Sequence, residues 1–193
     1  VSGNIIVIEG GPGTGKTKIL KEMIKRFGGH GRVAYIDCIK LDKELNVEHI
    51  ITKKNGVFGY LFKKFPKNMI LLLDNVDKLN EKNMERIKFL FDQNYLRAVV
   101  ITTEDYNMLN LNESVLQRVR KHVRLRSLSE YEAVQVVRDK VGEDLLNDRL
   151  IKETYRRSDK NMQRFLNNCE LVCKAYAGNN DLKEEEVEAV LAR

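Results

Sequence analysis

Short apolar runs alternate with amphipathic stretches through the first part of the chain. A parallel sheet that is buried on both faces has nearly continuous hydrophobic strands joined by helices, so this alternation predicts an α/β fold. The predicted strands are Asn4 to Glu9, Arg32 to Asp37, Met69 to Leu73, Ala98 to Thr102 and His122 to Leu125. The Met69 run is hydrophobic throughout, which indicates a strand inside the sheet.

Helical periodicity fills the intervals between these strands. The helices expected there are Gly15 to Arg26, Val47 to Thr52, Val57 to Lys64, Glu81 to Gln93 and Glu113 to Arg118. Beyond Ser127 no strand pattern appears, and the expected helices are Ser129 to Val141, Asp148 to Arg157, Asn161 to Ala177 and Glu184 to Leu191. The change predicts a core domain over residues 1–127 and a helical domain over residues 128–193.

Composition narrows the class of protein. Of the 193 residues, 42% are hydrophobic and 32% are charged, which suits a core covered by a charged surface. No stretch approaches the roughly 18 apolar residues of a membrane span. The three cysteines cannot close a disulfide set, so a cytoplasmic location is expected. Cys169 and Cys173 could offer two metal ligands on one helix, but without a nearby histidine pair we expect buried apolar side chains. The chain starts at Val1 rather than Met, which suggests a piece of a longer protein.

The segment Gly10 to Thr17 carries the clearest chemistry. It lies between a predicted strand and a predicted helix, and it reads Gly-Gly-Pro-Gly-Thr-Gly-Lys-Thr, the full pattern of a phosphate-binding loop. Glycines let successive N–H groups point at a phosphate, and the helix start adds a positive dipole end. We expect ATP or ADP with Mg²⁺, with Lys16 on the β- and γ-phosphates and the Thr17 hydroxyl on the metal. The expected contacts are Gly11, Pro12, Gly13, Thr14, Gly15, Lys16, Thr17 and Lys18.

A second part of such a site is an acidic residue at the end of a buried strand. Asp74 follows the apolar run from Ile70 and is the expected residue of the Mg²⁺ shell. Most hydrolysing proteins of this class place a glutamate next, to orient the attacking water, whereas this chain has Asn75. An amide can hydrogen-bond to water but cannot accept its proton. Hydrolysis is therefore expected to be slow, or Asp77 takes part of the role.

These features, with Thr102-Thr103 ending the fourth strand and a helical tail behind, resemble the AAA+ ATPases of the initiator type. That group includes the archaeal and eukaryotic origin-recognition proteins. The resemblance implies a five-stranded parallel sheet of order 5-1-4-3-2 with a small all-α lid. It also implies an ATPase that couples ATP binding and hydrolysis to subunit assembly and DNA-linked remodelling, as in replication initiation or helicase loading.

The resemblance also implies roles for single residues. Thr102 or Thr103 occupies the position called sensor 1, which senses the γ-phosphate; otherwise each is a threonine that merely ends a strand. Arg118 is the candidate for the arginine that reaches a neighbouring subunit's nucleotide, and Arg120 is the second choice. Both belong to a basic cluster, so a solvent-facing or DNA-facing arginine is the alternative.

Two further positions depart from the family pattern. The sensor 2 arginine of the lid falls on Gln163 or, with a shift of one residue, on Arg164, which we favour. Asp37 stands where the family usually has an asparagine that holds the catalytic glutamate. Both members of that pair would then be altered, since Asn75 stands in place of the glutamate.

The expected partners follow from the same residues. Homo- or hetero-oligomers would form through the face that carries Arg118, and the net charge of +6 is compatible with DNA. No membrane partner is expected. One alternative is a regulatory nucleotide switch of the STAND type, although Glu104 replaces the arginine usual after the strand threonines. The other is an AAA+ subunit that binds ATP without hydrolysing it.

Overall fold

The computed structural model describes residues 4–28, 32–40, 47, 51, 67–79, 81–109, 113–142, 145–178 and 182–192. The helices expected at Val47 to Thr52 and Val57 to Lys64 lie outside this range, apart from Val47 and Ile51. Contacts divide the chain into two compact units. We call Val1–Gly10 with Lys16–Leu125 the sheet unit, and Gly11–Gly15 with Arg126–Arg193 the helical unit.

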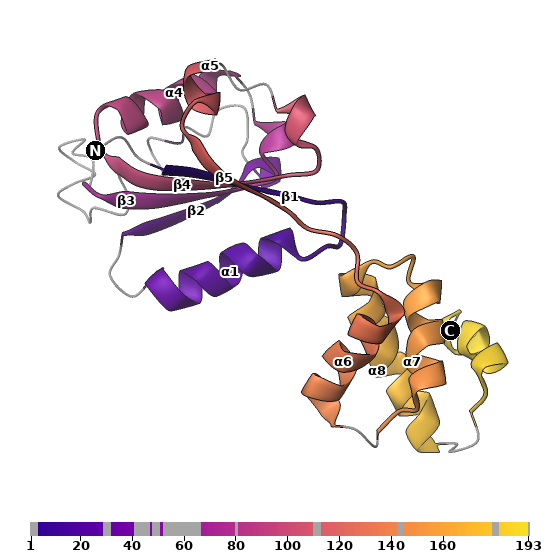
Figure 1. The fold of residues 1–193 in the computed structure, drawn as a ribbon. Helices are drawn as coiled ribbons and strands as arrows, with labels where there is room; N and C mark the ends of the chain where they lie inside the picture. The colour runs from indigo at the N-terminus through magenta and orange to yellow at the C-terminus, as the bar shows by residue number, and fades with distance from the viewer. Residues whose placement is uncertain are drawn as a thin grey trace. The chain divides into compact units, whose positions relative to one another are not determined.

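The sheet unit is built on five parallel strands (Figure 1). These are β1 (Asn4–Glu9), β2 (Val33–Asp37), β3 (Met69–Asp74), β4 (Leu96–Thr103) and β5 (Val119–Arg124). They lie in the order β2-β3-β4-β1-β5, which confirms the predicted order. The α/β fold with a parallel sheet and C-terminal helices is confirmed with it.

β5 begins at Val119, three residues before the start that its hydrophobicity predicts. Among the described strands its partner is β1, and it forms one edge of the sheet. Arg120 and Lys121 are exposed within it. An edge strand is covered less than an internal one, so the apolar run that marks β3 is missing from β5.

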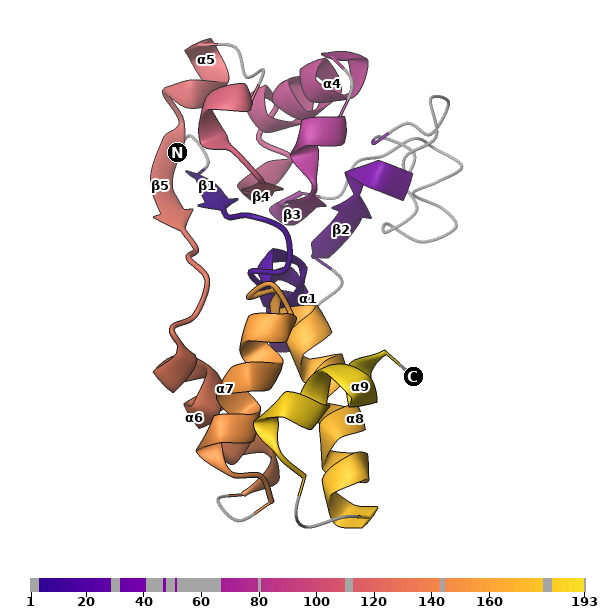
Figure 2. The ribbon, with the colours of Figure 1, turned by 90° about the vertical axis from the view of Figure 1, so that its right-hand side faces the viewer.

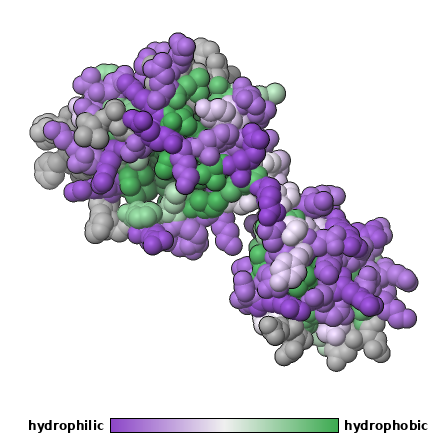
Figure 3. All heavy atoms as spheres, in the orientation of Figure 1, coloured by the Kyte–Doolittle hydropathy of each residue, from purple (hydrophilic) through white to green (hydrophobic). Residues whose placement is uncertain are grey.

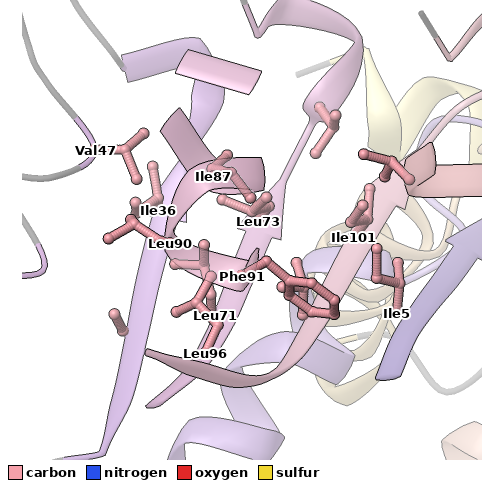
Figure 4. Packing of buried hydrophobic residues seen from close by; sticks show 14 of the residues in the cluster. Ile5, Ile36, Val47, Leu71, Leu73, Ile87, Leu90, Phe91, Leu96 and Ile101 are labelled. Atoms are coloured by element: carbon pink, nitrogen blue, oxygen red, sulfur yellow. The ribbon is translucent and has the colours of Figure 1, made fainter. Parts of the chain in front are cut away.

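Helices cover both faces of the sheet. α1 (Lys16–Phe27) lies on one face, and α4 (Glu81–Asp92) and α5 (Glu113–Leu116) lie on the other (Figures 1 and 2). Because side chains alternate along a strand, Leu72 packs with the α1 face, while Leu71 and Leu73 pack with the α4 face. Figure 4 shows Ile87, Leu90 and Phe91 of α4 packed against this second face.

The helical unit has a separate core. Its helices are α6 (Glu130–Val141), α7 (Asp148–Arg157), α8 (Met162–Gly178) and α9 (Val187–Leu191). Tyr155 and Phe165 are fully buried and meet edge to face, with ring centroids 5.0 Å apart. The Tyr155 hydroxyl donates to the Leu128 carbonyl at 2.7 Å. Hydrophilic side chains cover most of the visible face of this unit (Figure 3), as expected when its apolar residues turn inward.

A capping box begins α6, as the sequence predicts. The Ser129 hydroxyl accepts the Glu132 N–H, and the Glu132 carboxylate accepts the Ser129 N–H. The Arg126 guanidinium donates to both carboxylate oxygens, at 2.7 and 2.8 Å. Together Arg126 and the Ser129 backbone lower the pKa of Glu132 from 4.5 to about 2.

This capping carboxylate predicts a pH dependence of stability. Since the pKa of Glu132 is lower in the folded state, its contribution is complete above pH 4.5 and is lost as the pH falls toward about 2. Urea midpoints, followed by circular dichroism, should differ between wild type and Glu132→Gln at pH 7, and the gap should close toward pH 2. Exposed Glu185→Gln is the matched control and should show little difference at either pH. A gap for Glu132→Gln that persists undiminished at pH 2 would contradict the prediction.

Candidate functional site

The loop between β1 and α1 has the backbone that a phosphate cradle needs. Gly13 and Gly15 have φ of 75° and 97°, a region that side chains with a Cβ rarely adopt. The Thr14 hydroxyl donates to the Gly11 carbonyl at 2.8 Å and closes a turn within the loop. The loop holds Gly11, Pro12, Gly13, Thr14 and Gly15, and the first turn of α1 holds Lys16, Thr17 and Lys18.

Lys16 is 7% exposed, and its ammonium donates to the Gly10 carbonyl at 2.5 Å. The cation is therefore held at the mouth of the loop, at the start of α1. Thr17 follows in the same first turn, where the N–H groups that have no partner within the helix and the helix dipole favour an anion. Left-handed glycines, a buried lysine and a helix start together fit a phosphate group.

Asp74 lies in a buried network at the carboxyl ends of β2, β3 and β4. It is 1% exposed. Its Oδ1 accepts the Thr102 hydroxyl at 2.5 Å, and its Oδ2 accepts the Tyr35 hydroxyl at 2.9 Å. Burial, and then the bond to Asp74, raise the pKa of Tyr35 far above its usual value, so the phenol remains a donor. A carboxylate held in this way is prepared to act on a cation.

Asn75 connects this network to β2. Its backbone is left-handed, with φ 57° and ψ 53°, and its N–H donates to the Thr102 hydroxyl at 3.0 Å. Its side-chain amide donates to Asp37 Oδ1 at 3.2 Å. Asp37 and Asp74 are register partners on β2 and β3, which explains how residues so distant in sequence come together.

The Asp77 carboxylate accepts hydrogen bonds from the residues at the end of β4. Its two oxygens accept the Thr103 hydroxyl at 2.5 Å and the Glu104 N–H at 3.1 Å. Both oxygens therefore anchor the turn that follows β4. Of the two threonines predicted as sensor 1, Thr102 is bonded to Asp74 and Thr103 is bonded to Asp77.

Arg118 lies directly before β5 and is bound within its own unit. Its Nη1 is 2.5 Å from the Asp92 carboxylate, although the alignment is too poor for a hydrogen bond. The guanidinium also lies over the Phe91 ring, 5.2 Å from the centroid, and the side chain is 29% exposed. Arg120, the second choice, is exposed. To reach a neighbouring subunit, Arg118 would first have to leave Asp92 and Phe91.

The start of α8 holds both candidates for sensor 2. Arg164 donates to Asp159 at 2.7 Å and is 60% exposed. The Gln163 amide donates to Asn167 at 3.2 Å. In the same unit, the Met162 N–H donates to the Gly13 carbonyl at 3.0 Å.

Sequence reasoning missed a charged cluster at the end of β1. Glu9 is 7% exposed and meets His122 at 2.7 Å and Arg124 at 2.9 Å. The Tyr106 ring stacks on His122, with centroids 4.3 Å apart. The Arg124 hydrogen bond lowers the pKa of Glu9 despite its burial. The sequence signal that could have revealed this cluster is Glu9 itself, a single carboxylate at the end of an apolar strand and directly before the loop.

The cysteines lie in the helical unit or in the sheet core. Burial raises the pKa of the Cys169 thiol to about 12, so it remains protonated and apolar. Within the described ranges, no group of three or more His, Cys, Asp or Glu side chains could hold a metal ion by itself. The described helices include none with the length and apolar character needed to cross a membrane.

A family model described as "AAA domain" matches residues 2–134, which include the loop, Asp74, Thr102 and Arg118. No curated protein sequence matches this chain. Several solved structures are similar to this chain at low sequence identity.

A RuvB variant from Thermotoga maritima (P216G) is similar with a TM-score of 0.74 and 13% identity, over 98% of this chain and 62% of that one. Domain III of the Thermotoga maritima replication initiation protein DnaA is similar with a TM-score of 0.68 and 20% identity, over 98% of this chain and 83% of that one. The Aeropyrum pernix ORC1 protein in complex with DNA is similar with a TM-score of 0.73 and 13% identity, over 98% of this chain and 59% of that one. At these identities the likeness shows the fold. The chain spans less than two thirds of the RuvB and ORC1 chains.

Proposed function

The chain belongs to the AAA domain family, and we propose that it is an ATPase of the initiator type, which uses ATP binding and slow hydrolysis to control assembly on DNA. Members of this family are typically ATPases. The observation that carries the proposal is the phosphate loop before α1, with Lys16 buried at its mouth and Asp74 at the carboxyl edge of the same sheet. Ligands of open parallel sheets bind at that edge.

The donor set also fits Mg²⁺. This ion is usually held by one or two protein oxygens together with substrate phosphates. Thr17 and Asp74 would supply the protein oxygens, and the bound ion would neutralise charge on the phosphates. Tyr35 and Thr102 would keep the Asp74 carboxylate in one orientation.

Asp74→Asn tests the proposal. The variant should still bind a fluorescent ATP analogue, because Lys16 and the loop are intact, but its Mg²⁺-dependent phosphate release should fall at least about tenfold. Exposed Asp139→Asn on α6 is the control and should behave as wild type. Unchanged turnover in Asp74→Asn, or turnover that needs no divalent cation, would refute this role for Asp74.

The link to DNA is supported by charge and by structural likeness. Arg120, Lys121 and Arg124 are exposed along the edge strand β5, and the net charge of the chain is +6. The similar structures include an ORC1 protein in complex with DNA.

Phosphate release should increase when duplex DNA is added, and the affinity for DNA should fall steeply as the salt concentration rises. Sedimentation with ATP and with ADP would show whether assembly follows the nucleotide.

The second candidate is a subunit that binds ATP without hydrolysing it. The observation in its favour is Asn75, whose amide is already bonded to Asp37 and cannot take a proton. Tight ATP binding by the wild-type protein, with no phosphate release under single-turnover conditions, would favour this candidate over the ATPase.

A further inference from the structure

Transfer of a phosphoryl group to water needs a side chain that orients the water. The residue after Asp74 is Asn75, so the usual carboxylate is missing from that position. Among the described residues, the carboxylates at the ends of β2 and β3 and in the turn that follows are Asp37, Asp74 and Asp77. Their contacts decide which of them is available for the task.

Two of the three carboxylates accept a protein donor on each oxygen. Asp74 accepts hydroxyls from Tyr35 and Thr102, one on each oxygen. Asp77 accepts the Thr103 hydroxyl and the Glu104 N–H, again one on each oxygen. Neither carboxylate can turn toward a water molecule without breaking a bond that holds the end of a strand.

Among the described residues, hydrogen-bond donors meet only one oxygen of Asp37. Its Oδ1 accepts the Asn75 amide and the Ile39 N–H, each at 3.2 Å. Its Oδ2 is 3.7 Å from the ammonium of Lys40, a separation too long for a hydrogen bond. The Lys40 side chain is 83% exposed. The Asp37 side chain is 19% exposed and lies at the register position beside Asp74. One oxygen is therefore oriented by Asn75, while Oδ2 accepts no hydrogen bond from the described residues and lies on a partly exposed side chain at the carboxyl edge of the sheet.

We propose that Asp37 orients the attacking water and accepts its proton, while Asn75 holds Asp37 in place. The amide and the carboxylate have thus exchanged positions relative to the pattern that the AAA+ resemblance implies. The water oxygen bonds to the γ-phosphorus, and the bond from that phosphorus to the β–γ bridging oxygen breaks, with ADP taking the electron pair. The water proton passes to Asp37 and then to solvent. This assignment rests on the proposed ATPase function.

The test compares wild type with Asp37→Asn, Asn75→Asp and the double exchange of both residues. Asp37→Asn should bind Mg²⁺–ATP within about threefold of wild type, because general-base residues contribute to rate rather than to binding, while single-turnover hydrolysis should fall about 100-fold or more. The double exchange places the amide at position 37 and the carboxylate at position 75, as in the family pattern. It should bind ATP, and its turnover should be equal to or above that of Asp37→Asn.

Unfolding by urea without nucleotide gives a readout independent of turnover. Asn75→Asp brings two carboxylates together and Asp37→Asn brings two amides together, so both single variants should unfold earlier than wild type. The double exchange should regain the wild-type midpoint. Two single effects that simply add in the double variant would show that the pair is not formed and would overturn the role of Asn75.

Failure of the role of Asp37 and failure of the ATPase function give different results. Wild-type turnover by Asp37→Asn would make the pair merely structural and would overturn the assignment. Glu104→Gln, which removes an exposed carboxylate after β4, should leave turnover unchanged, and a large loss there would point to Glu104 instead. If the wild-type protein binds ATP without hydrolysing it, the ATPase proposal fails and the role of Asp37 fails with it.

Discussion

Lys16→Ala is expected to weaken ATP binding by about 10- to 100-fold. Hydrogen bonds to charged groups contribute about 1.5–3 kcal/mol, and each 1.4 kcal/mol is about a factor of ten in affinity. Lys16 is the buried cation at the mouth of the phosphate loop, so its removal takes away the strongest expected partner of the β- and γ-phosphates. Titration of a fluorescent ATP analogue measures the effect.

The control for Lys16→Ala is Lys21→Ala, an exposed lysine farther along α1. It removes the same charge from the same helix and should leave ATP affinity within about twofold of wild type, as expected for an exposed site. Thermal unfolding with and without saturating ATP gives a second measurement, because a ligand that binds only the folded state raises the midpoint. The same ATP concentration should raise the midpoint of Lys16→Ala less than the midpoints of wild type and Lys21→Ala. Intact ATP binding by Lys16→Ala would refute the site.

Phe165→Ala is expected to destabilise the helical unit by about 3–5 kcal/mol, the usual cost of removing a buried aromatic ring. Phe165 is fully buried, and its ring and that of Tyr155 meet edge to face. A domain is stable by only about 5–15 kcal/mol, so we expect much of this small unit to unfold. Hydrogen exchange of the α6, α7 and α8 amides measures the loss region by region.

Leu171→Ala on the same helix is the matched control, since Leu171 is 44% exposed. It should change stability by less than about 0.5 kcal/mol. The amides of β3 should keep their protection in both variants, because its residues belong to hydrophobic clusters other than the one around Phe165. Equal effects of Phe165→Ala and Leu171→Ala would contradict the predicted core.

The parts of this protein that depend on local sequence could be predicted. β1 and β3 are apolar runs with clear ends, and the loop before Lys16 consists of consecutive residues whose spacing carries its chemistry. β5 was placed too late because an edge strand with exposed Arg120 and Lys121 lacks such a run.

The contacts of the candidate site depend instead on which strands are neighbours and in which register. Tyr35 reaches Asp74, and Asn75 reaches Asp37, only because β2 pairs with β3. The sequence suggested Asp77 as a substitute for the missing glutamate, a prediction that remains untested. Its bonds to Thr103 and Glu104 follow from the position of β4 beside β3, which no spacing along the chain reveals.

The left-handed backbone of Asn75 limits which residues could replace it during the evolution of this protein. Asparagine, aspartate and glycine adopt that conformation readily, whereas most other residues pay about 1–2 kcal/mol there. A glutamate arriving at position 75 would meet that strain and the charge of Asp37 together. An asparagine arriving first at position 37 would leave neither position with a carboxylate. Each single step is unfavourable, so Asp37 and Asn75 should be inherited as a pair, and sequences that lose one should also have lost the other.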